Sequence, residues 1–262
     1  MSEDIRPILD DWPYDPEDEV MVRKVVLPDG ESRLQLRLEL GVLEMHPAGR
    51  PDGQRPEGFD SLLDWQIDRA RREMSEGGEE RFQLSGDECR DLRREAMQYY
   101  HRRITWLRLG EFRRAAEDAE HNLAIMDLLK DRAADQEDAL ESEQYRALVL
   151  SHLTRARALQ CLNEGNLRGA MRALDDGIET IEGLFRDDYE QPELSEQSDE
   201  LIALRELRRS LRERPYAPAG IRRESDRERL QRELASAVEH EEYELAASLR
   251  DQITALPPRP MP

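Results

Sequence analysis

The sequence has few of the residues that build metal centres and disulfide-bonded folds. Its 262 residues include two cysteines and five histidines, and aromatic side chains make up 5%. Cys89 and Cys161 lie far apart and neither belongs to a CxxC pair, which excludes a disulfide framework and a cysteine-based zinc site. We expect both cysteines to be buried apolar residues of helices.

Long hydrophobic runs are also missing. No apolar stretch approaches the length that spans a bilayer, and residues 1–12 are acidic and lack the apolar centre of a signal peptide. We therefore expect a cytoplasmic protein of bacterial type that has no membrane partner.

Recognisable catalytic motifs are not found either. The sequence contains no GxxxxGK[ST], GxGxxG or GxSxG pattern, and none of its five histidines forms a HExxH or His-x-His set. His101 and His121 could approach each other across a pair of helices. We predict no catalytic residue, no metal and no cofactor, and hence not an enzyme, although an active site built from the abundant acidic pairs remains open.

What the sequence has in excess is acidic charge. It carries 59 acidic and 39 basic residues, for a net charge of −20, and only Lys24 and Lys130 among the basic residues are lysines. Nucleic-acid affinity comes mainly from neutralising phosphates. Direct binding to nucleic acid is therefore not expected from the overall charge.

Patterning predicts a mainly α-helical chain with one small β element near the N-terminus. The predicted segments are an acidic flexible arm (1–18), a β-hairpin plus helix (19–73), an antiparallel helical domain (87–213), a linker (214–224) and a helical hairpin (225–256). Residues 73–86, between the β-hairpin plus helix and the helical domain, are interpreted as a further linker.

The β-hairpin is predicted from alternation. Residues 20–27 are rich in valine, residues 34–42 place leucine or valine at every second position, and a Pro-Asp-Gly-Glu turn joins the two runs. A lone hairpin is marginal in water. We expect the helix at residues 59–73 to cover its leucine face through Leu62, Leu63, Ile67 and Ala70, with an intermolecular sheet as the alternative. The arm is expected to dock through Trp12 and Tyr14.

A loop rich in glycine and proline, residues 46–58, follows the hairpin and carries Arg50 and Arg55. Two arginines in such a loop could bind a phosphate or a peptide carboxylate. The glycine spacing of a nucleotide site is missing. The loop is either a structured connector or part of a ligand-binding or hydrolytic site.

Residues 87–213 contain two similar helix pairs. LRLGEFRRAAEDAEHNL and CLNEGNLRGAMRALDDGI align on Gly110 and Gly165, which predicts helices at 87–109 and 111–130, a long helix starting within 131–143, a helix at 166–185 and a last helix at 194–211. This arrangement resembles tetratricopeptide repeats (TPR), although the two copies are 55 residues apart rather than about 34. The alternative is a generic bundle of helical hairpins.

The C-terminal stretch, residues 225–256, gives the most specific pattern. Leu230, Leu234 and Ala237 mark one short amphipathic helix, and the run YELAASLRDQITAL, residues 243–256, marks a second. The stretch resembles the UVR motif, a helical hairpin shared by the excision-nuclease subunits UvrB and UvrC and also found in some Clp ATPases and McsA-type adaptors. The paired CxxC motifs of those adaptors are missing here.

The resemblance implies contact with a protein partner rather than chemistry. It predicts a protein–protein interaction adaptor that docks on an excision-repair subunit or a Clp-type ATPase, with the helical domain presenting a groove to a second protein. Neither the partner nor the oligomeric state follows from the sequence. The residues expected at the hairpin interface are Tyr243, Glu244, Leu249, Arg250 and Asp251.

Two alternatives remain open at this point. A DNA-repair accessory protein would touch nucleic acid directly, through an arginine cluster on the first helix pair. A ligand-binding or hydrolytic protein would use the N-terminal hairpin and the Arg50–Arg55 loop. The arginines of the predicted cluster are Arg102, Arg103, Arg108, Arg113 and Arg114.

Overall fold

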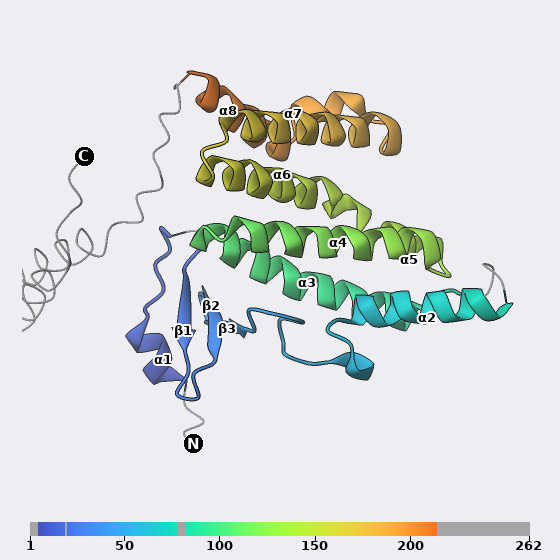
Figure 1. Ribbon diagram of the computed structural model, residues 1–262, viewed down its shortest axis with the longest axis horizontal. Coiled ribbons are helices and arrows are strands. Elements are labelled where there is room, and N and C mark those ends of the chain that lie inside the picture. The colour runs from blue at the N-terminus through green and yellow to red at the C-terminus, as the bar shows by residue number, and fades with distance from the viewer. Residues whose placement is uncertain (1–4, 19, 78–81, 214–262) are drawn as a thin grey trace, which may run out of the picture.

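A computed structural model describes residues 5–18, 20–77 and 82–213 of the protein. It confirms the mainly helical fold class, with a small three-stranded antiparallel sheet near the N-terminus (Figure 1). The longer helices lie roughly side by side in one stack, and the sheet lies beside the lower part of that stack in this view. The elements of the stack are α2 (Leu62–Gly77), α3 (Gly86–Leu109), α4 (Phe112–Arg132), α6 (Arg146–Asn163), α7 (Leu167–Gly183) and α8 (Asp199–Glu213).

The sheet is a meander of β1 (Val22–Val26), β2 (Ser32–Leu38) and β3 (Gly41–Met45), in the order β1-β2-β3. The predicted turn between the first two strands is present, and Gly30 adopts the left-handed conformation that a turn needs, with φ of 85°. The prediction of one continuous second strand to residue 42 was wrong. A tight turn at Glu39 and Leu40 ends β2, and it leaves Leu40 87% exposed.

The leucine face of the sheet is covered by α3, not by α2 as predicted. Leu34 and Leu36 pack in one cluster with Trp106 of α3, whose indole is only 1% exposed. The sheet is thereby fixed to the first long helix by side chains about 70 residues apart in the sequence. Leu63 of α2 packs instead in a separate cluster with Phe82 and Leu84.

The N-terminal arm packs against the opposite face of the sheet through the two aromatic residues that were predicted to dock it. The Arg23 guanidinium lies 4.3 Å from the ring centre of Trp12, and the Arg37 guanidinium lies 5.8 Å from that of Tyr14. Arg37 also donates from Nε to the Trp12 carbonyl at 2.8 Å. These contacts confirm the predicted docking of the arm, which includes the short helix α1 (Arg6–Asp11).

Residues 82–85 are part of the core rather than of a linker. Phe82 and Leu84 are buried with Leu63 of α2 and Cys89 of α3. The backbone of Leu84 also bonds to the end of α4, accepting from the Ala134 amide at 2.9 Å. Glycine and glutamate around these two apolar residues gave the segment the composition of a linker, so the predicted linker at 73–86 was wrong in this part.

The two predicted helix pairs are present, as α3 with α4 and α6 with α7. Gly110 and Gly165 stand at equivalent points, each just beyond the end of the first helix of its pair, with φ of 75° and 72°. Glycine adopts this left-handed conformation without the strain that a Cβ would bring. In the second pair, a Cβ on Gly177 would lie 2.7 Å from Cβ of Thr154. Glycine therefore allows α7 to approach α6 closely.

The long helix predicted to begin within residues 131–143 begins later, at Arg146. The residues before Arg146 form instead the short helix α5 (Gln136–Leu140) and a 3-10 turn at Glu143–Tyr145. Asp135 caps α5 by accepting from the Glu137 amide at 2.8 Å. The last helix, α8, likewise starts at Asp199 instead of residue 194. The remaining short helical elements are Pro56–Gly58, Leu184–Asp188 and Pro192–Glu196.

Candidate functional site

The five residues predicted to contact a partner lie outside the described part of the chain. Tyr243, Glu244, Leu249, Arg250 and Asp251 all belong to the predicted hairpin at 225–256, and the linker at 214–224 lies outside as well. Their proposed role therefore depends on the sequence. The described residues test the other two predicted sites, the Arg50–Arg55 loop and the arginine cluster.

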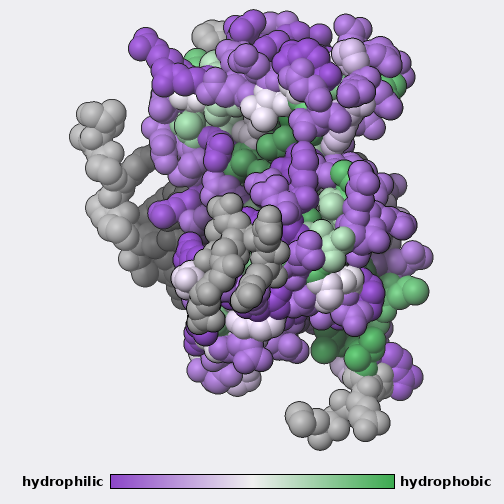
Figure 2. All heavy atoms as spheres, turned by 90° about the vertical axis from the view of Figure 1, so that its right-hand side faces the viewer, coloured by the Kyte–Doolittle hydropathy of each residue, from purple (hydrophilic) through white to green (hydrophobic). Residues whose placement is uncertain are grey.

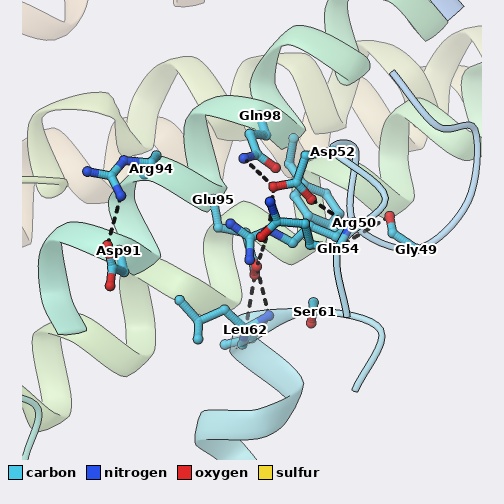
Figure 3. A network of polar contacts seen from close by, with 12 residues as sticks. Gly49, Arg50, Asp52, Gln54, Ser61, Leu62, Asp91, Arg94, Glu95 and Gln98 are labelled. Atoms are coloured by element: carbon cyan, nitrogen blue, oxygen red, sulfur yellow. Dashed lines mark hydrogen bonds and ion pairs between the residues drawn. The ribbon is translucent and has the colours of Figure 1, made fainter. Parts of the chain in front are cut away.

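In the loop, Arg50 and Arg55 both line a small hollow of about 280 Å³, but each is paired with acidic residues. Nε of Arg50 lies 3.3 Å from the Asp52 carboxylate and 3.4 Å from the Glu95 carboxylate (Figure 3). Arg55 pairs with Asp60 at 2.9 Å. The two arginines of the loop thus have separate acidic partners.

The Glu95 carboxylate is the centre of this network. It is fully buried and accepts the backbone amides of Leu62 at 2.7 Å and Leu63 at 3.1 Å, at the first turn of α2 (Figure 3). A carboxylate at a helix N-terminus satisfies amides that have no partner within the helix. Nε2 of His121 lies 3.0 Å from the same carboxylate. Glu95 therefore links α2, α3, α4 and the loop. This is what the interpretation of the loop as a structured connector predicts.

His121 and His101, which could have approached each other, have different partners. The His121 ring stacks on Tyr99 with 3.6 Å between the ring centres, and the His101 ring packs edge-on against Tyr100 at 5.4 Å. In the part of the chain that the structure describes, no group of three histidine, cysteine or acidic residues is placed to hold a metal ion.

The predicted arginine cluster does not form one basic surface. Arg102 is 5% exposed and its guanidinium forms two hydrogen bonds with the Asp118 carboxylate, at 2.7 and 2.9 Å. Arg103 is fully buried. Arg108 pairs with Asp18 and Arg113 with Glu117, while Arg114 lies over the Trp106 ring. Because two of the five are buried and two more are paired with acids, the five residues do not form one phosphate-binding patch.

Hollows in the stack are the remaining candidates for binding. One groove of about 570 Å³ lies between α6 and α8, and a second of about 690 Å³ lies where α4, α6 and α7 meet. Seen from the right-hand side of Figure 1, the surface is mostly hydrophilic, and hydrophobic residues show in the recesses between the helices (Figure 2). The first groove is lined from α6 by Ser151, His152 and Arg155, and from α8 by Asp199, Glu200 and Glu206.

Sequence reasoning placed position 103 in two ways. Tyr100, Arg103 and Trp106 recur every three residues near one side of α3, which predicts an inward-facing arginine. The same arginine was also assigned to a surface cluster, and the structure shows that it is buried.

Comparisons with known proteins support the motif and leave the helical body without a match. Residues 227–256 match the family model of the UvrB/uvrC motif. No curated protein and no solved structure matches the chain, so the TPR resemblance of the helix pairs stays a prediction. No helix in the described part of the chain combines the length and apolarity that crossing a bilayer requires.

Proposed function

We propose that this protein is a non-enzymatic adaptor that uses residues 227–256 to bind a protein partner. The observation that carries the proposal is the match of these residues to the UvrB/uvrC motif. The partner is an excision-repair subunit or a Clp-type ATPase, two of the kinds of protein that contain this hairpin. The expected contact residues are Tyr243, Glu244, Leu249, Arg250 and Asp251.

The described body favours this function over the two alternatives. A direct nucleic-acid contact needed the arginine cluster, and Arg102 and Arg103 are buried. A ligand-binding or hydrolytic site at the loop needed free groups, and Arg50 and Glu95 are bound to each other and to neighbours. A protein-binding role requires neither of these sites.

Arg250 provides the sharpest test of the proposal. An arginine at the centre of an interface commonly contributes 2 kcal/mol or more to binding, which is about 30-fold in affinity. We expect Arg250→Glu to reduce recovery of the partner from native-cell extract at least about 10-fold, measured by quantitative mass spectrometry on material captured by the immobilised full chain.

The matched control is Arg232→Glu, which makes the same charge change in the same stretch at a position that is not among the residues carrying the resemblance. It is expected to recover the partner as the unchanged protein does. Equal recovery by the Arg250→Glu and unchanged proteins would count against the assignment.

A further inference from the structure

Arg103 of α3 is a buried charge with no hydrogen-bond partner in the described part of the chain. Its side chain is fully buried, and Nε, Nη1 and Nη2 all lack an acceptor. The neighbouring acid, Asp118, has both carboxylate oxygens bonded to Arg102. An unpaired charge inside a protein is strongly unfavourable, and a buried ion is normally paired with an opposite charge. The position therefore calls for an anion from outside.

Arg103 keeps its charge at neutral pH. Burial lowers the pKa of its guanidinium to about 10, and the nearby negative charge of Asp118 opposes this shift. A pKa of about 10 leaves the group protonated at pH 7. A buried polar group without a partner is unfavourable even when neutral, and a buried charge without one is more so.

A second polar group without a partner lies close to the first. Nδ1 of His152 on α6 is buried and has no hydrogen bond in the described chain. The Tyr100 ring connects the two residues, with its centre 5.4 Å from the Arg103 guanidinium and 6.5 Å from the centre of the His152 ring. We call Tyr100, Arg103 and His152 the α3–α6 seam.

The seam meets the groove between α6 and α8 at His152. His152 belongs both to the seam and to the lining of the groove, which Arg155 of α6 also lines, whereas Arg103 and Tyr100 do not line it. His152 is partly exposed, and rotamer changes of side chains are common when a partner binds. Pairing of a ligand with Arg103 therefore requires the His152 ring to turn.

The charges of the groove indicate the kind of ligand. An arginine fork matches the planar geometry of a carboxylate, and Arg155 adds positive charge at the α6 side. The α8 side is acidic, with Asp199, Glu200 and Glu206. A polyanion would be repelled by that wall and by the net charge of −20. A segment that carries one carboxylate next to a basic residue complements both sides.

We propose that the groove between α6 and α8 binds a peptide segment of a protein partner, with one carboxylate of that segment pairing with Arg103 in the α3–α6 seam. This deepens the proposed function and rests on it only in treating the chain as a binder of proteins. It gives the helical body its own ligand class, a mixed-charge peptide, separate from whatever residues 227–256 bind.

The test is a selection of random 12-residue peptides on the full-length protein, followed by affinity measurements on the selected peptides. We expect these peptides to share an aspartate or glutamate beside a lysine or arginine. We also expect Arg103→Met to weaken their binding at least about 10-fold, because it removes one partner of a buried charge pair. Arg94→Met is the matched control, since Arg94 lies on the same helix but is exposed and forms an ion pair with Asp91; it should change affinity less than 2-fold.

Two further variants keep the test decisive. Arg103→Lys retains the charge without the fork and should bind with an affinity between those of the unchanged protein and Arg103→Met. Arg250→Glu should leave peptide binding unchanged, so that failure here and failure of the proposed function are told apart. A selection that yields no binding peptide would overturn the proposal. So would selected peptides that bind Arg103→Met as tightly as the unchanged protein, or that bind equally well after their aspartate or glutamate is replaced by its amide.

Discussion

Replacing Arg102 by methionine is expected to lower the free energy of unfolding by about 3–5 kcal/mol, the cost of breaking a buried ion pair from one side. Burial alone would lower the pKa of Arg102, but the Asp118 carboxylate more than offsets this and raises it. Without the arginine, Asp118 stays buried and loses both of the hydrogen bonds that Arg102 donates to it. The carbonyls of His46 and Gly49, which accept from Arg102 Nη1 at 3.1 and 2.6 Å, also lose that donor. Urea unfolding measures the change.

The control for Arg102 is again Arg94→Met, which removes an exposed ion pair and should cost less than about 1 kcal/mol. A second control replaces both partners, as Arg102→Met with Asp118→Leu, and should recover part of the lost stability because neither member of the pair is left buried without the other. A single Arg102→Met variant that unfolds within about 1 kcal/mol of the unchanged protein would show that the pair does not hold the loop to α3 and α4.

Acidification should destabilise the protein through His152. Burial, with the nearby positive charges of Arg103 and Arg155, lowers the pKa of His152 to about 4 from its usual 6.5. The unfolded chain therefore binds the proton more readily than the folded chain between these two values. The stability associated with neutral His152 is complete above pH 6.5 and is lost as the pH falls toward 4, by on the order of 2 kcal/mol at pH 5 and 3 kcal/mol at pH 4.

The measurement compares unfolding free energies of the unchanged protein and His152→Gln from pH 7 to pH 4.5. Carboxylates titrate in both proteins, so the difference between their slopes isolates the histidine. The glutamine variant should lose less stability over this range. Parallel slopes would mean that His152 takes up its proton as easily in the folded state as in the unfolded chain.

The helical part of the fold could be predicted because its signals are local. Gly110 and Gly165 mark the ends of helices by a conformation that only glycine adopts easily. In α7 the apolar residues recur at helical spacing. Four of the five predicted to mark its apolar face are buried, namely Ala170, Leu174, Ile178 and Ile181, and the fifth, Leu167, is partly buried.

The β region was harder to predict because alternation does not reveal a two-residue turn. Leucine or valine stands at every second position from Leu34 to Val42. The turn at Glu39 and Leu40 nevertheless places Val42 opposite Arg37, so that Leu43, opposite Leu36, continues the leucine face. The cover of the sheet depends on Trp106, a contact between distant parts of the chain that no local pattern specifies.

The candidate sites also divide into those marked by a local sequence pattern and those that depend on contacts between distant residues. The motif at residues 227–256 is a contiguous pattern and was recognised from its residues. Whether an arginine is exposed depends on which helices surround it, so Arg102 and Arg103 looked like members of a surface cluster until their burial was known. The acidic residues that pair with Arg50 come from its own loop and from α3, 45 residues away along the chain.

The most direct test of the adaptor proposal is site-specific photocrosslinking in the native cell. A photoreactive amino acid at position 243 should yield a discrete crosslinked protein identified as an excision-repair subunit or a Clp-type ATPase, whereas the same group at position 145, an exposed tyrosine of the helical body, should not yield that product. A position-243 probe that captures no protein, or that captures the same proteins as the position-145 probe, would contradict the account.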